Sequence, residues 1–415
     1  MPTEELKPAP SLEGSGETLS ENALEPKFTY AEAPKGSWAS DPALDGGITA
    51  WLVVLGAWCS LFCTFGWINN IFIEPIFFQH NCLDSLPPNI LHGPIVGTLY
   101  DRFGPRYLIL GGSLIHVFGL MMASISKEYY QVLLSQDVCT IPSWFDKKRG
   151  DAYGIVATGS SLGGVIFPSM VSRLIGQIGY GWTMRVAAFL IIFLLPIASL
   201  TVRSRVPPRP STMSKETLLK PFDEFKMLLV ILGFLFLTFG VFIPIDYIVV
   251  QAMSAGMSPN LAEYLISMLN AASLFGRMSA GISSDKVGHY NVLIGACVLA
   301  GILVLALWIP AASNAAIIVF TCTFGFSSGA YVSLANALIV KISPCPEIGH
   351  RTGLLFLFSS FGGLTTNPIA GAILQHDGGS YTGMKVFAGL FLLAGSVAVL
   401  AARLHYTGPV IKARF

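Results

Sequence analysis

Charged residues are scarce in this sequence. Only 12% of its 415 residues are Asp, Glu, Lys or Arg, while 53% are hydrophobic, and an ordinary soluble domain carries about 25% charged residues. A soluble chain of this size would lack the polar surface that water requires. The apolar residues come instead in blocks, and helices of about 20 residues can cross roughly 30 Å of hydrocarbon. The composition therefore predicts an all-α polytopic membrane protein.

Motifs for catalysis and cofactor binding are also absent. The sequence contains no Walker loop, no Gly-x-Ser-x-Gly elbow and no histidine pair at metal-ligand spacing. Its seven cysteines lack metal-ligand spacing and mostly lie within apolar runs, so we interpret them as packing residues. A net charge of +1 gives no reason to expect nucleic-acid binding. We expect neither an enzyme nor a protein that needs a metal or a cofactor, and the lipid bilayer is the predicted partner.

The N-terminal segment is different in composition. Residues 1–44 are rich in Glu, Pro, Ser and Gly, and they lack the apolar core of a signal peptide. Such a segment cannot bury enough apolar surface to fold. We predict a disordered cytoplasmic tail.

Ten apolar blocks are long enough to span a bilayer, allowing for tilt. They are residues 48–73, 107–126, 154–178, 186–202, 227–250, 261–282, 291–309, 315–340, 353–374 and 386–402. Two further pieces, residues 90–100 and 129–142, are too short, because eleven helical residues rise only about 16 Å. We interpret these two pieces as fragments of spans.

A polar, proline-containing stretch divides the blocks into two groups. Six full spans follow it, and six precede it if both fragments are counted. The predicted organisation is a tail (1–44), an N-terminal transmembrane half (45–202), a cytoplasmic linker (203–226), a C-terminal transmembrane half (227–404) and a short cytoplasmic tail (405–415).

A weak internal repeat supports two related halves. GTLYDRFGPR begins at Gly97, and GRMSAGISSDKVGHY ends at Tyr290; both contain Gly-x3-Asp-[Arg/Lys]-x-Gly, from Gly97 and from Gly281. Each stretch follows one apolar run and precedes another. Both are therefore predicted to lie at short connections between adjacent helices.

The distribution of cations predicts the orientation. In a twelve-span arrangement sixteen of them fall on one face, which the positive-inside rule makes cytoplasmic: Arg102, Arg106, Lys147, Lys148, Arg149, Arg203, Arg205, Arg209, Lys215, Lys220, Lys286, Lys341, Arg351, Arg403, Lys412 and Arg414. The opposite face keeps Lys127, Arg185 and Lys385. Both termini are then predicted to be cytoplasmic.

Two motifs carry a resemblance to a known family. DGGITAW starts at Asp45, and WFDKKRGDAYGIVATGSSLGG runs from Trp144 to Gly164. Together they resemble the monocarboxylate transporter-like branch of the major facilitator superfamily, and RVPPR (205–209) is most similar to its fungal members. The resemblance implies two six-helix halves that move a small organic acid or pathway metabolite by alternating access, with proton coupling as an option, at the plasma membrane.

The resemblance also implies a gating latch. In the superfamily's signature loop, Asp101, Arg102 and Arg106 would form a charge latch between the halves, with Asp285 as the counterpart in the second half. A carboxylate there can cap a helix N-terminus, and the small residues allow close helix approach. The alternative is a positive-inside anchor loop with a glycine turn.

The chain departs from proton-coupled members of the branch at two places. Such members carry a lysine near the outer end of the first span, where this chain has Asn69 and Asn70. They also place an aspartate four residues before the arginine of the eighth span, whereas here Ser273 precedes Arg277. The proton relay of those members is therefore incomplete in this chain.

Arg277 is the main candidate for substrate binding, with Asn69 and Asn70 as further candidates. A buried arginine is costly in a membrane, so one that faces the bundle interior is a functional candidate by default. We predict that it binds a substrate anion; the alternative is that it extends towards Asp285, two helical turns away.

Other polar residues inside the spans allow two interpretations each. Asp246 is either an interfacial carboxylate near the outer end of the seventh span or, if the chain is proton-coupled, the carboxylate that remains to carry the proton. Asn270, Asn336 and Asn367 could line a pathway, but bridges between helices are the preferred interpretation.

Two spans of the N-terminal half appear truncated, between Ile73 and Gly97 and between Cys139 and Ser143. One explanation, which we favour, is that the gene model wrongly removed coding sequence as introns. The other is that the chain is a genuinely shortened relative. The shortening leaves an alternative function open, namely a non-transporting sensor or an inactive truncated remnant of a transporter.

Overall fold

The computed structural model describes residues 46–64, 66, 144–145, 147–202, 215–344 and 347–408. These residues belong to one compact unit, residues 35–415. Several predictions fall outside the described residues: the N-terminal tail, the span at 107–126, both short fragments, Asn69, Asn70, Asp101, Arg102 and Arg106. They remain predictions.

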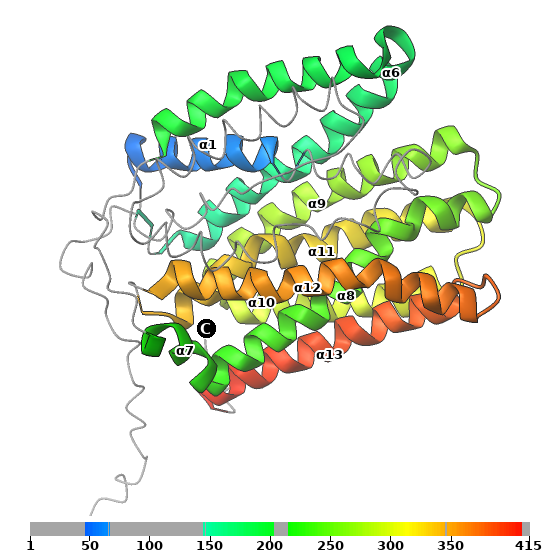
Figure 1. The fold of residues 1–415 in the computed structure, drawn as a ribbon. Coiled ribbons are helices and arrows are strands. Elements are labelled where there is room, and N and C mark those ends of the chain that lie inside the picture. The colour runs from blue at the N-terminus through cyan, green and yellow to red at the C-terminus, as the bar shows by residue number, and fades with distance from the viewer. Residues whose placement is uncertain are drawn as a thin grey trace, which may run out of the picture. The chain divides into compact units, whose positions relative to one another are not determined.

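Every regular element in the described ranges is helical (Figure 1). After the linker come α8 (Phe225–Ser254), α9 (Pro259–Val287), α10 (His289–Leu303) with its π-helical continuation η2 (Val304–Trp308), α11 (Asn314–Ile342), α12 (Ile348–His376) and α13 (Thr382–Thr407). They coincide with the six apolar blocks predicted for this part of the chain, which confirms that these blocks are helical. The linker range also contains a short helix, α7 (Lys215–Asp223), that the sequence analysis did not predict.

Helix α6 (Arg149–Thr201) contains two of the predicted spans. Its backbone leaves helical geometry at Gly179, where φ is 77° and ψ is 165°. Residues other than glycine rarely adopt this conformation. The chain turns back there, and the two arms of α6 diverge from this turn (Figure 1). The arms correspond to the apolar blocks at 154–178 and 186–202.

Helix α1 (Ile48–Cys63) packs closely against both arms of α6. A Cβ on Gly159 of the first arm would lie 2.4 Å from the Trp58 carbonyl oxygen, and one on Gly56 would lie 3.2 Å from the Ala198 carbonyl oxygen of the second arm. Small residues permit such contacts between backbones, which is how helices associate in lipid. Gly159 and Gly56 therefore allow α1 to pack closely against the two arms.

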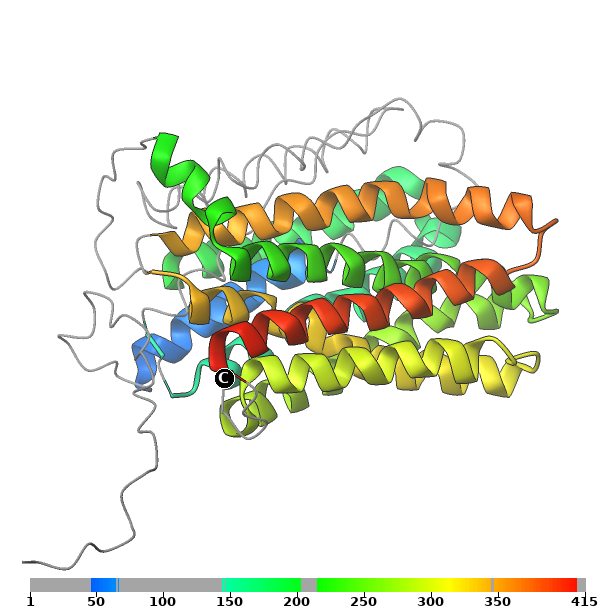
Figure 2. The same cartoon turned by 90° about the horizontal axis from the view of Figure 1, so that it is seen from below.

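The helices after the linker form a layered bundle (Figure 2). Helix α8 packs against α12 and α13, while α11 packs against α9 and α10. Glycines again mark the closest approach: a Cβ on Gly395 of α13 would lie 2.8 Å from the carbonyl oxygen of Gly233 of α8. Bulkier side chains would separate these helices.

Five described helical segments are long and apolar enough to cross a membrane: α6, α8, α10 with η2, α11 and α13. Helices α9 and α12 have 29 residues each, but they carry more polar residues. In α9 these include Asn270, Ser273, Arg277 and Ser284, all of which are buried. Because these polar groups face other helices and not lipid, a span can contain them.

Candidate functional site

The candidate site lies where α6 meets α9. The two helices are in contact over most of their length, from Asp285 beside Gly150 at one end to Glu263 beside Ser172 at the other. We call the first of these ends the linker end, because α7 and the start of α8 also lie there (Figure 1). The contact joins a helix from before the linker to a helix from after it.

Asp285 caps the N-terminus of α6. Its two carboxylate oxygens accept hydrogen bonds from the backbone N–H groups of Gly150, at 2.8 Å, and Asp151, at 3.0 Å. The first turn of a helix has N–H groups without intrahelical partners, and its dipole favours negative charge. A carboxylate from α9 thus supplies the cap that Lys148, at the N-cap position of α6, does not provide. The geometry is the kind of contact predicted for a latch residue.

Glycines bring the two backbones together beside this cap. A Cβ on Gly281 would lie 2.5 Å from the carbonyl oxygen of Gly150 and 2.9 Å from the Cα atom of Gly154. Real Cβ atoms do not approach backbone atoms so closely. Gly281 opens the repeat motif that Asp285 continues, so the motif supplies both the close approach and the cap.

Arg277 extends from α9 to α6 further along the same interface. Its side chain is buried, with 6% exposed. Its Nε atom donates to the Ser273 hydroxyl at 3.2 Å, and its Nη1 atom donates to the Ala157 carbonyl at 2.6 Å and to the Ser160 hydroxyl. The guanidinium therefore does not extend to the predicted cytoplasmic end of the helix near Asp285, which was the alternative prediction.

The hydrogen-bond partners of Arg277 are all neutral groups. No carboxylate among the described residues pairs with it. The hydrogen bonds that the guanidinium donates within the described part of the chain come from its Nε and Nη1 atoms. The hydroxyl group of Ser273 hydrogen-bonds to the guanidinium without neutralising it. A buried cation without a counter-ion is complementary to an anion.

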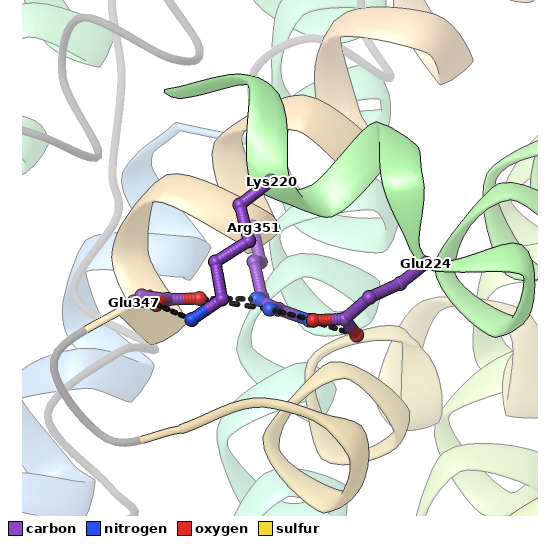
Figure 3. Close-up of polar contacts among 4 residues, drawn as sticks. All are labelled: Lys220, Glu224, Glu347 and Arg351. Atoms are coloured by element: carbon purple, nitrogen blue, oxygen red, sulfur yellow. Dashed lines mark hydrogen bonds and ion pairs between the residues drawn. The ribbon is translucent and has the colours of Figure 1, made fainter. Parts of the chain in front are cut away.

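A second charged group lies at the linker end and joins the linker to the start of α12. We call it the Arg351 cluster; it consists of Lys220, Glu224, Glu347 and Arg351 (Figure 3). The side chain of Arg351 is fully buried, and its Nη1 and Nη2 atoms donate to the two oxygens of Glu224 at 2.9 Å and 2.6 Å. Its Nε and Nη2 atoms donate to Oε2 of Glu347, and Lys220 donates to Oε1 of the same residue.

The cluster joins three elements. Lys220 belongs to α7, Glu224 separates α7 from α8, and Arg351 lies in the first turn of α12. Two cations and two carboxylates balance each other in charge, and each carboxylate is hydrogen-bonded. Sequence analysis placed Lys220 and Arg351 among the cations of one face but missed their partners; the i,i+4 spacing of Glu347 and Arg351 was the available signal.

The stability that the cluster contributes should depend on pH only in acid. Hydrogen bonds from Arg351 lower the pKa of Glu224 below its ordinary value of 4.5. Burial would raise the pKa of Glu347, but hydrogen bonds from Lys220 and Arg351 outweigh it and lower the pKa. A carboxyl whose folded-state pKa is lowered stabilises the fold above its ordinary pKa, and this stabilisation is lost as the pH falls through the folded-state pKa.

We therefore expect the thermal stability difference between the wild type and the Glu224→Gln/Glu347→Gln variant to stay constant from pH 7 to about pH 5 and to shrink below pH 4.5. Thermal denaturation of the lipid-reconstituted proteins between pH 3.5 and pH 7 measures this difference. A difference that changed between pH 6 and pH 7 would contradict the assignment.

Asp246 lies towards the opposite end of α8 from the linker. One of its carboxylate oxygens, Oδ1, is buried without a hydrogen-bond partner, and its neighbour is the side chain of Asn367 on α12. The adjacent Tyr247 donates to the Asn367 carbonyl at 3.2 Å. The residue as a whole is half-buried, and both interpretations of Asp246 stay predictions. Asn367 bridges α12 and α8, as the preferred interpretation of the span asparagines predicted.

Long apolar helices, buried polar groups at helix contacts and glycine-mediated packing define a multi-pass α-helical membrane protein. The sequence model of the family described as "Major Facilitator Superfamily" matches this chain over residues 138–324 and 245–413. The chain belongs to the major facilitator superfamily.

Several curated relatives match almost the whole chain. It is 52% identical to "MFS transporter asaE" of Aspergillus flavus, with 95% of this chain and 96% of that protein covered. It is 46% identical to the "Fujikurins efflux protein" of Gibberella fujikuroi, with 94% and 92% covered. It is 35% identical to "Agnestins efflux protein AgnL12" of Paecilomyces divaricatus, with 93% and 94% covered. These names favour transport over the sensor or remnant alternative.

The length of the first match also bears on the truncated spans. The match to asaE extends over 426 positions, although this chain has 415 residues of which 95% are included. About 30 of these positions must therefore be gaps in this chain. Two incomplete helices would account for a deficit of this size.

Solved structures agree on the fold. The human organic anion transporter MFSD10 superposes with a TM-score of 0.66 at 13% identity, covering 85% of this chain and 98% of that one. The transporter FucP in the outward conformation superposes with a TM-score of 0.64, also at 13% identity and with the same coverage.

Proposed function

We propose that this protein is a secondary transporter that exports a small organic acid or an acidic secondary metabolite by alternating access. The observation that carries the proposal is Arg277, a buried guanidinium at the α6–α9 contact that no described carboxylate neutralises. Relatives named for efflux of fujikurins and agnestins support export of a secondary metabolite.

In this proposal residues 45–202 and 227–404 are the two halves that move relative to each other. The linker end is the cytoplasmic end, since the cations of the sequence gather there, and both termini are cytoplasmic in a protein of the plasma membrane. Monocarboxylate-like substrates and coupling to protons belong to the same proposal. The two motifs at Asp45 and Trp144 support the first of these.

Asp285 is the latch residue of the second half in this proposal. Its cap on α6 must break when the linker end opens, because Gly150 and Asp151 belong to one half and Asp285 to the other. The corresponding residues of the first half would be Asp101, Arg102 and Arg106. The structure of α6 and α9 supports the second-half contact only.

Export is tested by metabolite measurement in cells. A strain that produces the chain is compared with a deletion strain for the ratio of extracellular to intracellular organic acids. We expect at least one acid to accumulate inside the deletion strain. Unchanged ratios for every acid detected, together with no uptake of labelled lactate, pyruvate or succinate by inside-out vesicles, would overturn the proposal.

Replacement of Arg277 by glutamine should weaken anion binding. Hydrogen bonds to a charged group contribute about 1.5–3 kcal/mol, so we expect KM for the transported anion to rise about 10- to 100-fold. Vesicle uptake at a series of concentrations measures this. Lys286→Gln is the matched control, because it removes an exposed cation from the same helix and should leave KM within about twofold. An Arg277→Gln variant with wild-type KM would exclude the anion site.

A further inference from the structure

A carboxyl group inside a membrane protein needs hydrogen-bond partners or a cation if it is to remain charged. Asp246 has little of either in this structure. Its Oδ1 atom is buried without a partner, and the side chain that hydrogen-bonds the carboxyl group is the neutral amide of Asn367. A protonated carboxyl fits these surroundings better than a carboxylate does.

The groups around Asp246 contain no neutralising charge among the described residues. On its own helix Tyr247 is adjacent, and Tyr381, which precedes α13, lies near Tyr247. Helix α12 presents Asn367. The cation at the start of α13, Lys385, is buried and donates to the Trp308 carbonyl at 2.9 Å. No charged side chain of the described parts of α7, α9 or α11 pairs with Asp246.

The helix that packs beside Asp246 presents an exposed polar residue, Asn367 of α12. Asn367 is exposed and lies nine residues before the C-terminal end of the helix, which ends at His376. It is held to α8 by the Tyr247 hydroxyl, which donates to its carbonyl oxygen at 3.2 Å. The carboxyl group of Asp246 is therefore hydrogen-bonded to a side chain, that of Asn367, which is itself exposed. Displacement of α12 from α8 would change the surroundings of Asp246 directly.

We propose that Asp246 is the proton-binding site through which this transporter couples to a pH gradient. The carboxyl group takes up a proton from water on one side of the membrane, keeps it while α12 and α8 are in the present contact, and releases it to water on the other side when that contact opens. The proton is the only species transferred to or from Asp246. The inference rests on the proposed transport function.

Infrared spectroscopy of the full chain in lipid nanodiscs tests the protonation without a substrate. We expect the carbonyl band of a protonated carboxylic acid at pH 7 in the wild type. The band should be lost in Asp246→Asn and kept in Asp377→Asn, a matched control that removes a carboxylate from the turn after α12. A band of equal strength in the wild type and Asp246→Asn would overturn the proposal.

Vesicles test the coupling. A gradient of one pH unit can drive about tenfold accumulation if one proton is exchanged for each substrate molecule. We impose this gradient in both directions and measure labelled lactate, pyruvate and succinate. In Asp246→Asn the gradient should no longer drive accumulation, whereas exchange of internal for external substrate at equal pH should persist; Asp377→Asn should behave as the wild type.

The outcomes separate the two proposals. Accumulation in Asp246→Asn that still follows the gradient would overturn the role of Asp246, and so would wild-type transport that ignores the gradient, while both leave export intact. Failure of the wild type in vesicles and in the export comparison would overturn the transport function. The infrared result would then still decide whether Asp246 holds a proton.

Discussion

Replacement of Arg351 by methionine is expected to destabilise the protein by about 3–5 kcal/mol. Removal of one partner from a buried ion pair leaves an uncompensated charge in a poorly solvated site. Here the loss would leave two carboxylates, Glu224 and Glu347, close together at the starts of α8 and α12. We expect a clear fall in the temperature at which the lipid-reconstituted protein loses its fold.

Two comparisons separate this effect from loss of packing. Lys220→Met removes a cation that contacts the same Glu347, but the Lys220 side chain is 55% exposed, so we expect a loss of at most about 1 kcal/mol. The triple variant Arg351→Met/Glu224→Gln/Glu347→Gln should recover most of the stability, since neutral glutamines need no counter-ion. If the triple variant were no more stable than Arg351→Met alone, the charge argument would be wrong.

The Arg351 cluster also has a mechanical consequence. It attaches α7, which lies in the linker between the two proposed halves, to α8 and α12. Because the linker is attached to the second half in this way, we expect α7 to move together with α8 and α12. Arg351→Lys keeps the charge but cannot form the paired hydrogen bonds to Glu224, so it separates the geometry of the attachment from its charge.

The spans could be predicted from sequence because hydrophobicity and length determine them. The six blocks after the linker and the two arms of α6 agree with the structure, and the reversal at Gly179 falls in the gap between the blocks at 154–178 and 186–202. What a bilayer requires of each segment is a local property of that segment. No knowledge of neighbouring helices was needed.

The contacts between spans could not be predicted in the same way. Asp285 was recognised as a residue able to cap a helix, but its partners Gly150 and Asp151 are more than 130 positions away in sequence. Arg277 was recognised as a buried cation, but its hydrogen bonds to Ala157 and Ser160 depend on how α6 packs against α9. Residue type indicated the chemistry, and packing decided the partner.

The surroundings of Asp246 could not be predicted from its position along a helix. Its distance along the seventh span placed it near the membrane surface, where a carboxylate is usually solvated. In the structure the residue is half-buried, the Asn367 side chain of α12 hydrogen-bonds the carboxyl group, and Oδ1 has no hydrogen-bond partner among the described residues. Burial is determined by the neighbouring helix, and sequence position alone cannot report it.

Alanine at Gly281 is expected to disrupt the α6–α9 contact at the linker end. The new Cβ would lie 2.5 Å from the Gly150 carbonyl oxygen and 2.9 Å from the Gly154 Cα atom, and both are backbone atoms that cannot rotate away. The helices must separate, and overpacking of this kind costs about 1–3 kcal/mol. Separation would also weaken the Asp285 cap on α6.

The same substitution at Gly295 provides the control. Gly295 lies in α10, and a Cβ there would meet no atom within 4 Å, so alanine should be neutral or stabilising by about 0.5–1 kcal/mol. Spin labels at Lys148 and Lys286, exposed positions at the linker ends of α6 and α9, report the separation in a background whose accessible cysteines are replaced by serine.

If Gly281 holds the linker end closed, Gly281→Ala should shift the label distances towards longer values, by about tenfold in population for each 1.4 kcal/mol, and Gly295→Ala should not. Equal distance distributions in the two variants would mean that the close approach stabilises the fold without determining which side of the transporter is open. In that case the Asp285 cap would be a structural contact and not a latch, since the cap and the glycine belong to the same motif and must open together.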